Sequence, residues 1–173
     1  MLQKVTIGTT NFRTGVFYEC VKLEEIIFTN SSDIDLSSGL GVFDGAGTEG
    51  EGITVQFNET VTKIPDYLFY SKSYEDIPKI IKVEFMENSQ CETIGKQAFS
   101  AAPITEINVP PSVKEMKEQA FHNCSSIRKV SITDLSAWCN IEFANEYSNP
   151  TYYSKLLYLN GESIVHLTIP EDV

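Results

Sequence analysis

The sequence predicts an α/β fold: a solenoid of stacked coils with a parallel β-sheet on one face and short helical turns on the other. The main observation is internal repetition, because Ala98-Phe99 returns as Ala120-Phe121 in the same apolar context. In addition, each dipeptide is followed by an alternating apolar pattern, Ile107-x-Val109 and Val130-x-Ile132. Repeats of roughly 20–50 residues are typical of solenoids, in which a unit buries its apolar face only by stacking on its neighbours.

The same template extends toward the N-terminus. Leu68-Phe69 is preceded by apolar residues at the expected spacing and is flanked by strand patterns at 53–57 and 83–85. Val16-Phe17 is followed by apolar residues at the offsets found after Phe121, namely Cys20, Leu23, Ile26 and Phe28. With a degenerate unit around Val42-Phe43 and a modified one around Leu135 and Trp138, we expect about six irregular repeats.

Residues 1–173 are expected to form one elongated domain, because hydrophobic residues make up 42% of the chain and no long polar linker divides it. Ile169–Val173 resembles Val109–Val113, the start of another repeat. We therefore expect a fragment of a longer array; the alternative is that the preceding hairpin closes the stack. The first seven residues lack the apolar stretch of a secretory signal, and no apolar window of about 18 residues predicts a membrane span.

The charge of the chain argues against two classes of partner. Thirteen basic and 24 acidic residues give a net charge of −11, spread evenly along the sequence. No basic cluster is present that would neutralise several phosphates at once. We therefore expect no nucleic acid as a partner, and no docking on anionic lipid, which needs a polybasic segment.

The cysteines predict packing rather than chemistry. Cys20, Cys91, Cys124 and Cys139 show no Cys-x-x-Cys spacing, and the chain has only two histidines, so a zinc site is not indicated. Cys20 and Cys124 share a repeat slot that is alanine in another unit, and Cys91 takes a slot that is valine in two others. These three are predicted to be buried free thiols that behave as small hydrophobes.

One face of the predicted sheet is available for recognition. Side chains alternate along a strand, so the middle residue of each apolar-x-apolar pattern points away from the core. Stacking would align these residues into one column of Ile27, Gln56, Glu84, Asn108, Ser131 and Thr168, and a second of Glu25, Thr54, Lys82, Glu106, Lys129 and His166. Such mixed polar groups suit a recognition face. We take Glu84, Asn108, Lys129 and Ser131 as candidate partner-binding residues; the alternative is a solvated face without function.

Aromatic residues gather near the C-terminus: Trp138, Tyr147, Tyr152, Tyr153 and Tyr158. Aromatic clusters stack on sugars or anchor interfaces. At least two of these rings are expected in the core, and Tyr152 and Tyr153 are added to the candidate partner-binding residues.

No motif indicates catalysis. The acidic, glycine-rich segment 44–52 could wrap calcium, although its spacing departs from the helix-loop-helix calcium pattern, and it lacks the Gly-Lys-Ser/Thr of a phosphate loop. His122 and Cys124 lie within one repeat turn, and the cysteine belongs to a packing slot, so they do not indicate a catalytic pair. No pair of carboxylates stands out for glycoside hydrolysis. We predict no enzymatic activity, no metal and no cofactor.

The segment from Ala120 to Ile127 reads Ala-Phe-x-x-Cys-x-x-Ile, and Asp134–Phe143 with Leu157–Glu162 forms a variant unit. These segments resemble the BspA-like class of bacterial leucine-rich repeats, found in surface proteins of gut, oral and treponemal bacteria. The resemblance covers nearly the whole chain, and it implies a right-handed leucine-rich-repeat superhelix located at the cell surface or secreted. Within the variant unit, Asn160-Gly161 predicts a two-residue hairpin, a local antiparallel excursion from the stack.

The resemblance implies a non-enzymatic protein–protein interaction or adhesion module, binding a host or bacterial surface protein through the sheet face or the irregular inserts. Two alternatives stay open: a structural spacer without its own ligand, and a carbohydrate-binding module that uses the aromatic C-terminal region. Because the Ala-Phe and cysteine slots are predicted to face the core, function is expected where the repeat breaks, at residues 30–52, 70–79 and 139–163.

Overall fold

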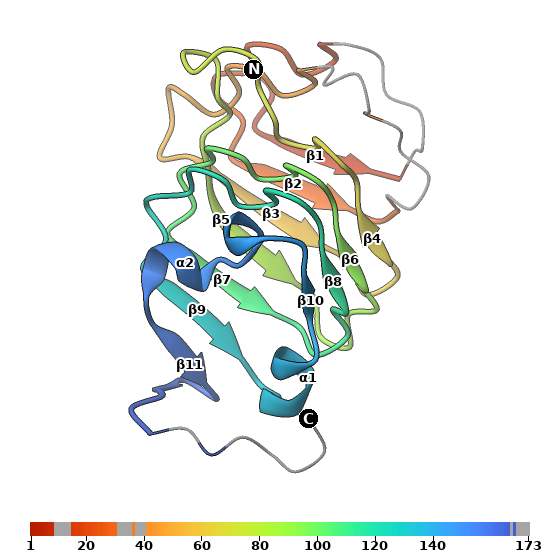
Figure 1. Cartoon of the computed structure of the whole chain (residues 1–173). Helices are drawn as coiled ribbons and strands as arrows, with labels where there is room; N and C mark the ends of the chain where they lie inside the picture. The colour runs from red at the N-terminus through yellow and green to blue at the C-terminus, as the bar shows by residue number, and fades with distance from the viewer. Residues whose placement is uncertain (9–14, 31–35, 37–40, 167, 169–173) are drawn as a thin grey trace.

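The computed structural model describes residues 1–8, 15–30, 36, 41–166 and 168. Its coils stack one on another, and most of them add one strand to a long sheet (Figure 1). The solenoid predicted from the repeat is confirmed. The eight strands of this sheet are, in spatial order, β1 (Lys4–Ile7), β2 (Glu25–Phe28), β3 (Ile53–Phe57), β5 (Ile80–Phe85), β7 (Glu106–Val109), β9 (Lys129–Ile132), β11 (Leu157–Leu159) and β12 (Glu162–Ser163).

All neighbours in this sheet pair in parallel except β11 and β12, which are antiparallel. Asn160 and Gly161 connect these two strands with φ values of 51° and 87°. Positive φ at both central residues is what a tight hairpin turn requires, so the predicted hairpin is confirmed. The first strand, β1, was not expected, although Val5-x-Ile7 shows the same short alternation as Ile26-x-Phe28.

The opposite side of the coils carries a second parallel sheet, which the sequence did not predict. Its strands, in spatial order, are β10 (Glu142–Phe143), β8 (Glu115–Met116), β6 (Thr93–Ile94) and β4 (Lys63–Ile64). Two residues are too few to show an alternating pattern. The helices α1 (Leu135–Cys139), η1 (Glu146–Ser148) and α2 (Thr151–Ser154) all belong to the variant unit near the C-terminus. The Asp134 carboxylate begins α1 by accepting the Ala137 N–H at 2.9 Å.

The phenylalanines of the repeat form a continuous ladder inside the stack. The centroids of neighbouring rings lie 5.2, 5.2, 5.5 and 5.4 Å apart along the series Phe17, Phe43, Phe69, Phe99 and Phe121. All of these rings except Phe17 are buried. Phe43 therefore marks a genuine, if degenerate, repeat. A shorter ladder of Phe28, Phe57 and Phe85 runs behind the large sheet, with centroid distances of 5.2 and 5.4 Å.

Left-handed residues close the turns that hold these rings. Gln97 and Ala101 flank Phe99 with φ values of 50° and 62°, and Gln119 and Asn123 flank Phe121 with 59° each. A right-handed helix does not continue through such residues. The Glu118–His122 segment is accordingly a single turn.

The cysteines pack as predicted for two of the three repeat slots. Cys91 and Cys124 are buried, and the Cys124 thiol donates to the Phe99 carbonyl at 3.0 Å. Cys20 is only half-buried, and it packs against the core. All four cysteines are free thiols.

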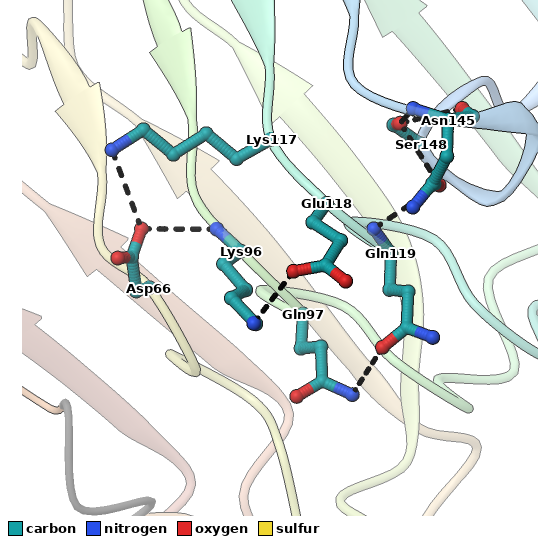
Figure 2. A network of polar contacts seen from close by, with 8 residues as sticks. All are labelled: Asp66, Lys96, Gln97, Lys117, Glu118, Gln119, Asn145 and Ser148. Carbon is teal, nitrogen blue, oxygen red and sulfur yellow. Dashed lines mark hydrogen bonds and ion pairs between the residues drawn. The ribbon is translucent and has the colours of Figure 1, made fainter.

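Polar side chains join successive coils on the second face (Figure 2). Lys96 forms an ion pair with Glu118 at 2.6 Å, and the Gln97 side chain donates to that of Gln119 at 2.9 Å. The Asp66 carboxylate accepts the Lys96 backbone N–H at 2.9 Å. These groups bind the next coil, so this face serves mainly to hold the stack together.

Candidate functional site

The register of the large sheet confirms most of the two predicted columns. Gln56 lies opposite Glu84, and Asn108 lies opposite Ser131. Glu106 lies between Lys82 and Lys129 in the second column. The four candidate residues of the sheet face therefore stand on three strands that follow one another in the sheet, β5, β7 and β9.

The predicted ends of both columns are wrong. Thr168 and His166 lie outside the sheet, and Tyr158 of β11 occupies the position next to Ser131. The reason is the Asn160-Gly161 turn, which reverses the chain directly after β11. Tyr158 instead extends the face, because the Lys129 ammonium lies 5.3 Å from the centre of its ring.

Glu84 is held in place by two neighbours. One carboxylate oxygen forms an ion pair with Lys82 at 2.6 Å, and the other accepts a hydrogen bond from Gln56 at 3.0 Å. The hydrogen bond to Glu84 raises the pKa of Lys82, and Glu106 adds to the effect. By contrast, within the described part of the chain the side chains of Asn108 and Ser131 make no hydrogen bond.

A groove separates β5 from β7 at the ends of these strands. Their pairing stops at Val83 and Ile107, whereas β3 pairs with β5 as far as Phe85 and β7 pairs with β9 as far as Val109. After β2, β3, β5 and β11 the next residue donates its N–H to the preceding coil, as Met86 does to the Phe57 carbonyl at 2.9 Å. Pro110 follows β7 and has no N–H to give to the Phe85 carbonyl.

Two openings make up this groove. The first, about 310 Å³, lies on the sheet face and is lined among others by Glu84, Asn108 and Ser131. The second, about 460 Å³, lies beyond the strand ends beside Pro110 and Pro111. The openings adjoin each other, because they share four lining residues, Phe85, Met86, Glu87 and Asn108. Three of the predicted residues therefore meet at one concave place.

Tyr152 and Tyr153 lie elsewhere. They belong to α2, and the Tyr153 hydroxyl accepts the N–H of Asn123 at 2.6 Å, in the turn that precedes β9. The groove, by contrast, lies where β5 and β7 end. Glu84, Asn108 and Ser131 thus lie at the groove, Lys129 lies at the start of β9, and the two tyrosines lie on α2, which contacts β9.

The α2 region is a cluster of edge-to-face rings. Centroid distances are 5.2, 5.3 and 5.0 Å along His122, Tyr147, Tyr152 and Tyr153. Tyr152 is 41% exposed, and the Lys155 ammonium lies 4.4 Å from its ring centre. Tyr153 is half-buried, and burial raises its pKa. One ring of the pair thus faces solvent while the other anchors α2.

The glycine-rich segment packs into the core rather than standing out as a loop. Phe43 and Ala46 are buried, and Gly47 has φ of 72° with Ile53 so close that a Cβ would clash at 2.5 Å. Burial raises the pKa of Asp44, and the Asp76 charge adds to the effect. Within the described ranges, no group of three or more His, Cys, Asp or Glu side chains is arranged to hold a metal ion. Residues 31–35 and 37–40 of the expected functional insert lie outside the described residues.

Comparison with known families matches two overlapping stretches, residues 10–148 and 52–173, to the BspA type leucine rich repeat region, with six copies. The chain belongs to the BspA-type leucine-rich repeat family. The family resemblance read from the sequence is thereby confirmed. No curated protein and no solved structure matches the chain. Among the described helices, none is long and apolar enough to cross a membrane.

Sequence reasoning did not find the groove. It identified Glu84, Asn108 and Ser131 as outward residues, but it did not predict that β5 and β7 part beside them. The available signal was Pro110-Pro111 directly after a strand pattern, which marks the end of a hydrogen-bonded ladder.

Proposed function

We propose that this BspA-type repeat array is a non-enzymatic recognition module, which binds a protein partner through the exposed face of its eight-stranded sheet. The main observation that supports this proposal is the balance of positive and negative charges on that face. Its outward strand residues from β1 to β11 include three lysines and three glutamates: Lys4, Lys82, Lys129, Glu25, Glu84 and Glu106.

The chain as a whole carries a net charge of −11, so its excess negative charge lies away from this face. Like charges facing each other across an interface cost several kcal/mol. A balanced face is therefore the part of an acidic molecule that other proteins, many of them also acidic, approach without repulsion.

The construction of the face also suits recognition. Its residues stand on paired strands of a rigid stack, and Glu84 is fixed by Lys82 and Gln56. Asn108 and Ser131 offer an amide and a hydroxyl beside the groove. A side chain that is already held in place, as that of Glu84 is, costs little side-chain entropy on binding. Family membership supports placing the protein at the cell surface or outside the cell, with a host or bacterial surface protein as its partner.

A matched pair of triple variants tests the proposal. Immobilised host matrix proteins and bacterial surface extracts are probed with the intact chain, with Glu84→Ala/Asn108→Ala/Lys129→Ala, and with a variant of the same residue types on other exposed surfaces, Glu92→Ala/Lys114→Ala/Asn140→Ala. We expect the sheet-face variant alone to lose binding, by at least about tenfold in Kd. Equal binding by all three proteins would refute the sheet face as the binding surface.

A second candidate function is carbohydrate binding at α2. The observation that favours it is the 41% exposed Tyr152, whose ring packs edge-to-face against Tyr147 and Tyr153. Exposed aromatic faces stack on the apolar faces of sugars. A glycan array probed with the intact chain and with Tyr152→Ala tests this: a signal that Tyr152→Ala abolishes supports it, and an empty array counts against it. Failure of both tests would leave the spacer role.

A further inference from the structure

The groove between β5 and β7 has an apolar floor and an acidic rim. Phe85 is the last ring of its ladder, and it is half-buried where Phe28 and Phe57 are fully buried. Met86 is 47% exposed beside it. Pro110 and Pro111 complete an apolar wall in the second opening. An occupant of this groove therefore needs a slender apolar part.

Three carboxylates and one ammonium line the first opening: Glu84, Glu87, Glu106 and Lys82. The Lys82 ammonium forms an ion pair with the Glu84 carboxylate at 2.6 Å. Neither Glu87 nor Glu106 has an ion-pair partner within the part of the chain that the structure describes. Glu106 stands between Lys82 and Lys129 in the sheet, so its charge is partly compensated, whereas that of Glu87 is not. The four charges that line the opening sum to −2, which favours a cationic occupant.

We propose that this groove receives an extended segment of a partner protein and takes up a lysine or arginine side chain from it. The aliphatic stem of such a side chain covers apolar surface while its charged end stays at a polar rim. Here the stem lies along Phe85, Met86 and Pro110, and the charged end reaches Glu87 and Glu106. The Asn108 amide oxygen offers a further acceptor.

The shape of the groove supports an extended segment. Its two openings adjoin each other, one on the sheet face and one beyond the strand ends, so an extended segment can lie across both. An acidic peptide or a nucleic acid is disfavoured by the two carboxylates and by the net charge of −11. The inference rests on the proposed protein-binding function and names the chemistry of the partner.

Peptide titration of the isotope-labelled chain tests the inference. The probes are the capped peptide Ala-Ala-Arg-Ala-Ala and the same peptide with citrulline, which keeps the shape of arginine and removes its charge. We expect the arginine peptide to shift the amide signals of Glu84, Met86 and Asn108 saturably, and to bind at least about tenfold more tightly than the citrulline peptide. Added salt should weaken the arginine peptide and leave the citrulline peptide nearly unchanged.

Matched variants locate the charge. Glu87→Gln/Glu106→Gln should lose at least about tenfold in affinity for the arginine peptide. The control is Glu59→Gln/Glu25→Gln, because Glu59 stands at the Glu87 position one coil earlier and Glu25 stands in the same column as Glu106, and neither lines the groove. Any one of three results would overturn the inference. These are equal affinity for the two peptides, equal loss of affinity in both variants, and no shift of the amide signals at about 10 mM arginine peptide. If the sheet-face triple variant still abolishes capture of a partner protein, the proposed function stands without it.

Discussion

Removing the ring of Phe99 should be among the most damaging single changes to this fold. Phe99 is 0% exposed and lies in the middle of the ladder, with the rings of Phe69 and Phe121 stacked on either side at 5.5 and 5.4 Å. In a solenoid each coil is stabilised mainly by its two neighbours. A central ring therefore contributes to two interfaces between coils, and a terminal ring to one.

The expected cost follows from these contacts. Replacing a buried phenylalanine with alanine typically costs about 3–5 kcal/mol, including the cavity that remains. Each stacked ring pair adds about 0.5–1.5 kcal/mol beyond the buried area, and Phe99 has two such pairs, so a value near 5 kcal/mol is expected for Phe99→Ala. Phe99→Leu keeps most of the apolar volume and should cost about 2 kcal/mol, chiefly for the lost ring pairs.

Equilibrium urea unfolding, followed by circular dichroism, measures these values against Phe17→Ala. Phe17 is half-buried and stacks on Phe43 at 5.2 Å, so its truncation removes less buried surface than that of Phe99 and should cost about 1–2 kcal/mol. Loss of the central ring should also broaden the transition, because it uncouples the coils on either side. A cost for Phe99→Ala no greater than that for Phe17→Ala, with an unchanged slope, would refute the ladder as the main coupling between coils.

Three further outcomes are expected. Gly95→Ala should lower the free energy of unfolding by roughly 1–3 kcal/mol in the same urea assay. A Cβ there would lie 2.5 Å from the Asp66 nitrogen and 2.6 Å from the Ile64 carbonyl oxygen, both backbone atoms of the preceding coil. An unchanged urea midpoint would show that the coils part easily. Ala101→Gly should raise the free energy of unfolding by up to about 1 kcal/mol, because alanine occupies a left-handed conformation with φ of 62°. A lower melting temperature of this variant would contradict the prediction. Burial raises the pKa of Cys91 from 9.0 to about 12, so the folded state keeps a neutral thiol where the unfolded state releases a proton. The stability that this thiol contributes is therefore present below pH 9 and falls between pH 9 and about 12, by about 1.4 kcal/mol per pH unit. The free energy of unfolding of Cys91→Ala should depend less steeply on pH over that range. Parallel pH profiles of the two proteins would contradict the burial argument.

The sequence predicted what depends on periodicity. The phenylalanine ladder and the outward columns repeat with the coil, so a match at Phe99 and Phe121 located Phe69, Phe43 and Phe17 as well. The candidate residues Glu84, Asn108 and Ser131 followed from the same alternation.

What the sequence did not predict depends on local geometry. The two-residue strands of the second sheet are shorter than any alternating pattern, and their pairing comes from the stacking of coils rather than from their own residues. The column ends at Thr168 and His166 were wrong because one Asn-Gly turn outweighs the repeat spacing. The separation of Tyr152 from the sheet face depends on where α2 docks, which no period encodes.

The groove shows how a repeat protein can gain a specific site without losing its scaffold. Where the repeat is followed faithfully, each strand pairs along its length, as between β7 and β9. A single proline after β7 removes one donor, and Phe85, the last ring of the shorter ladder, is only half-buried. Both features lie at the ends of strands, while the buried ladder through Phe99 and Phe121 continues unbroken. Recognition can therefore vary at the strand ends, because the energy that holds the coils together resides elsewhere.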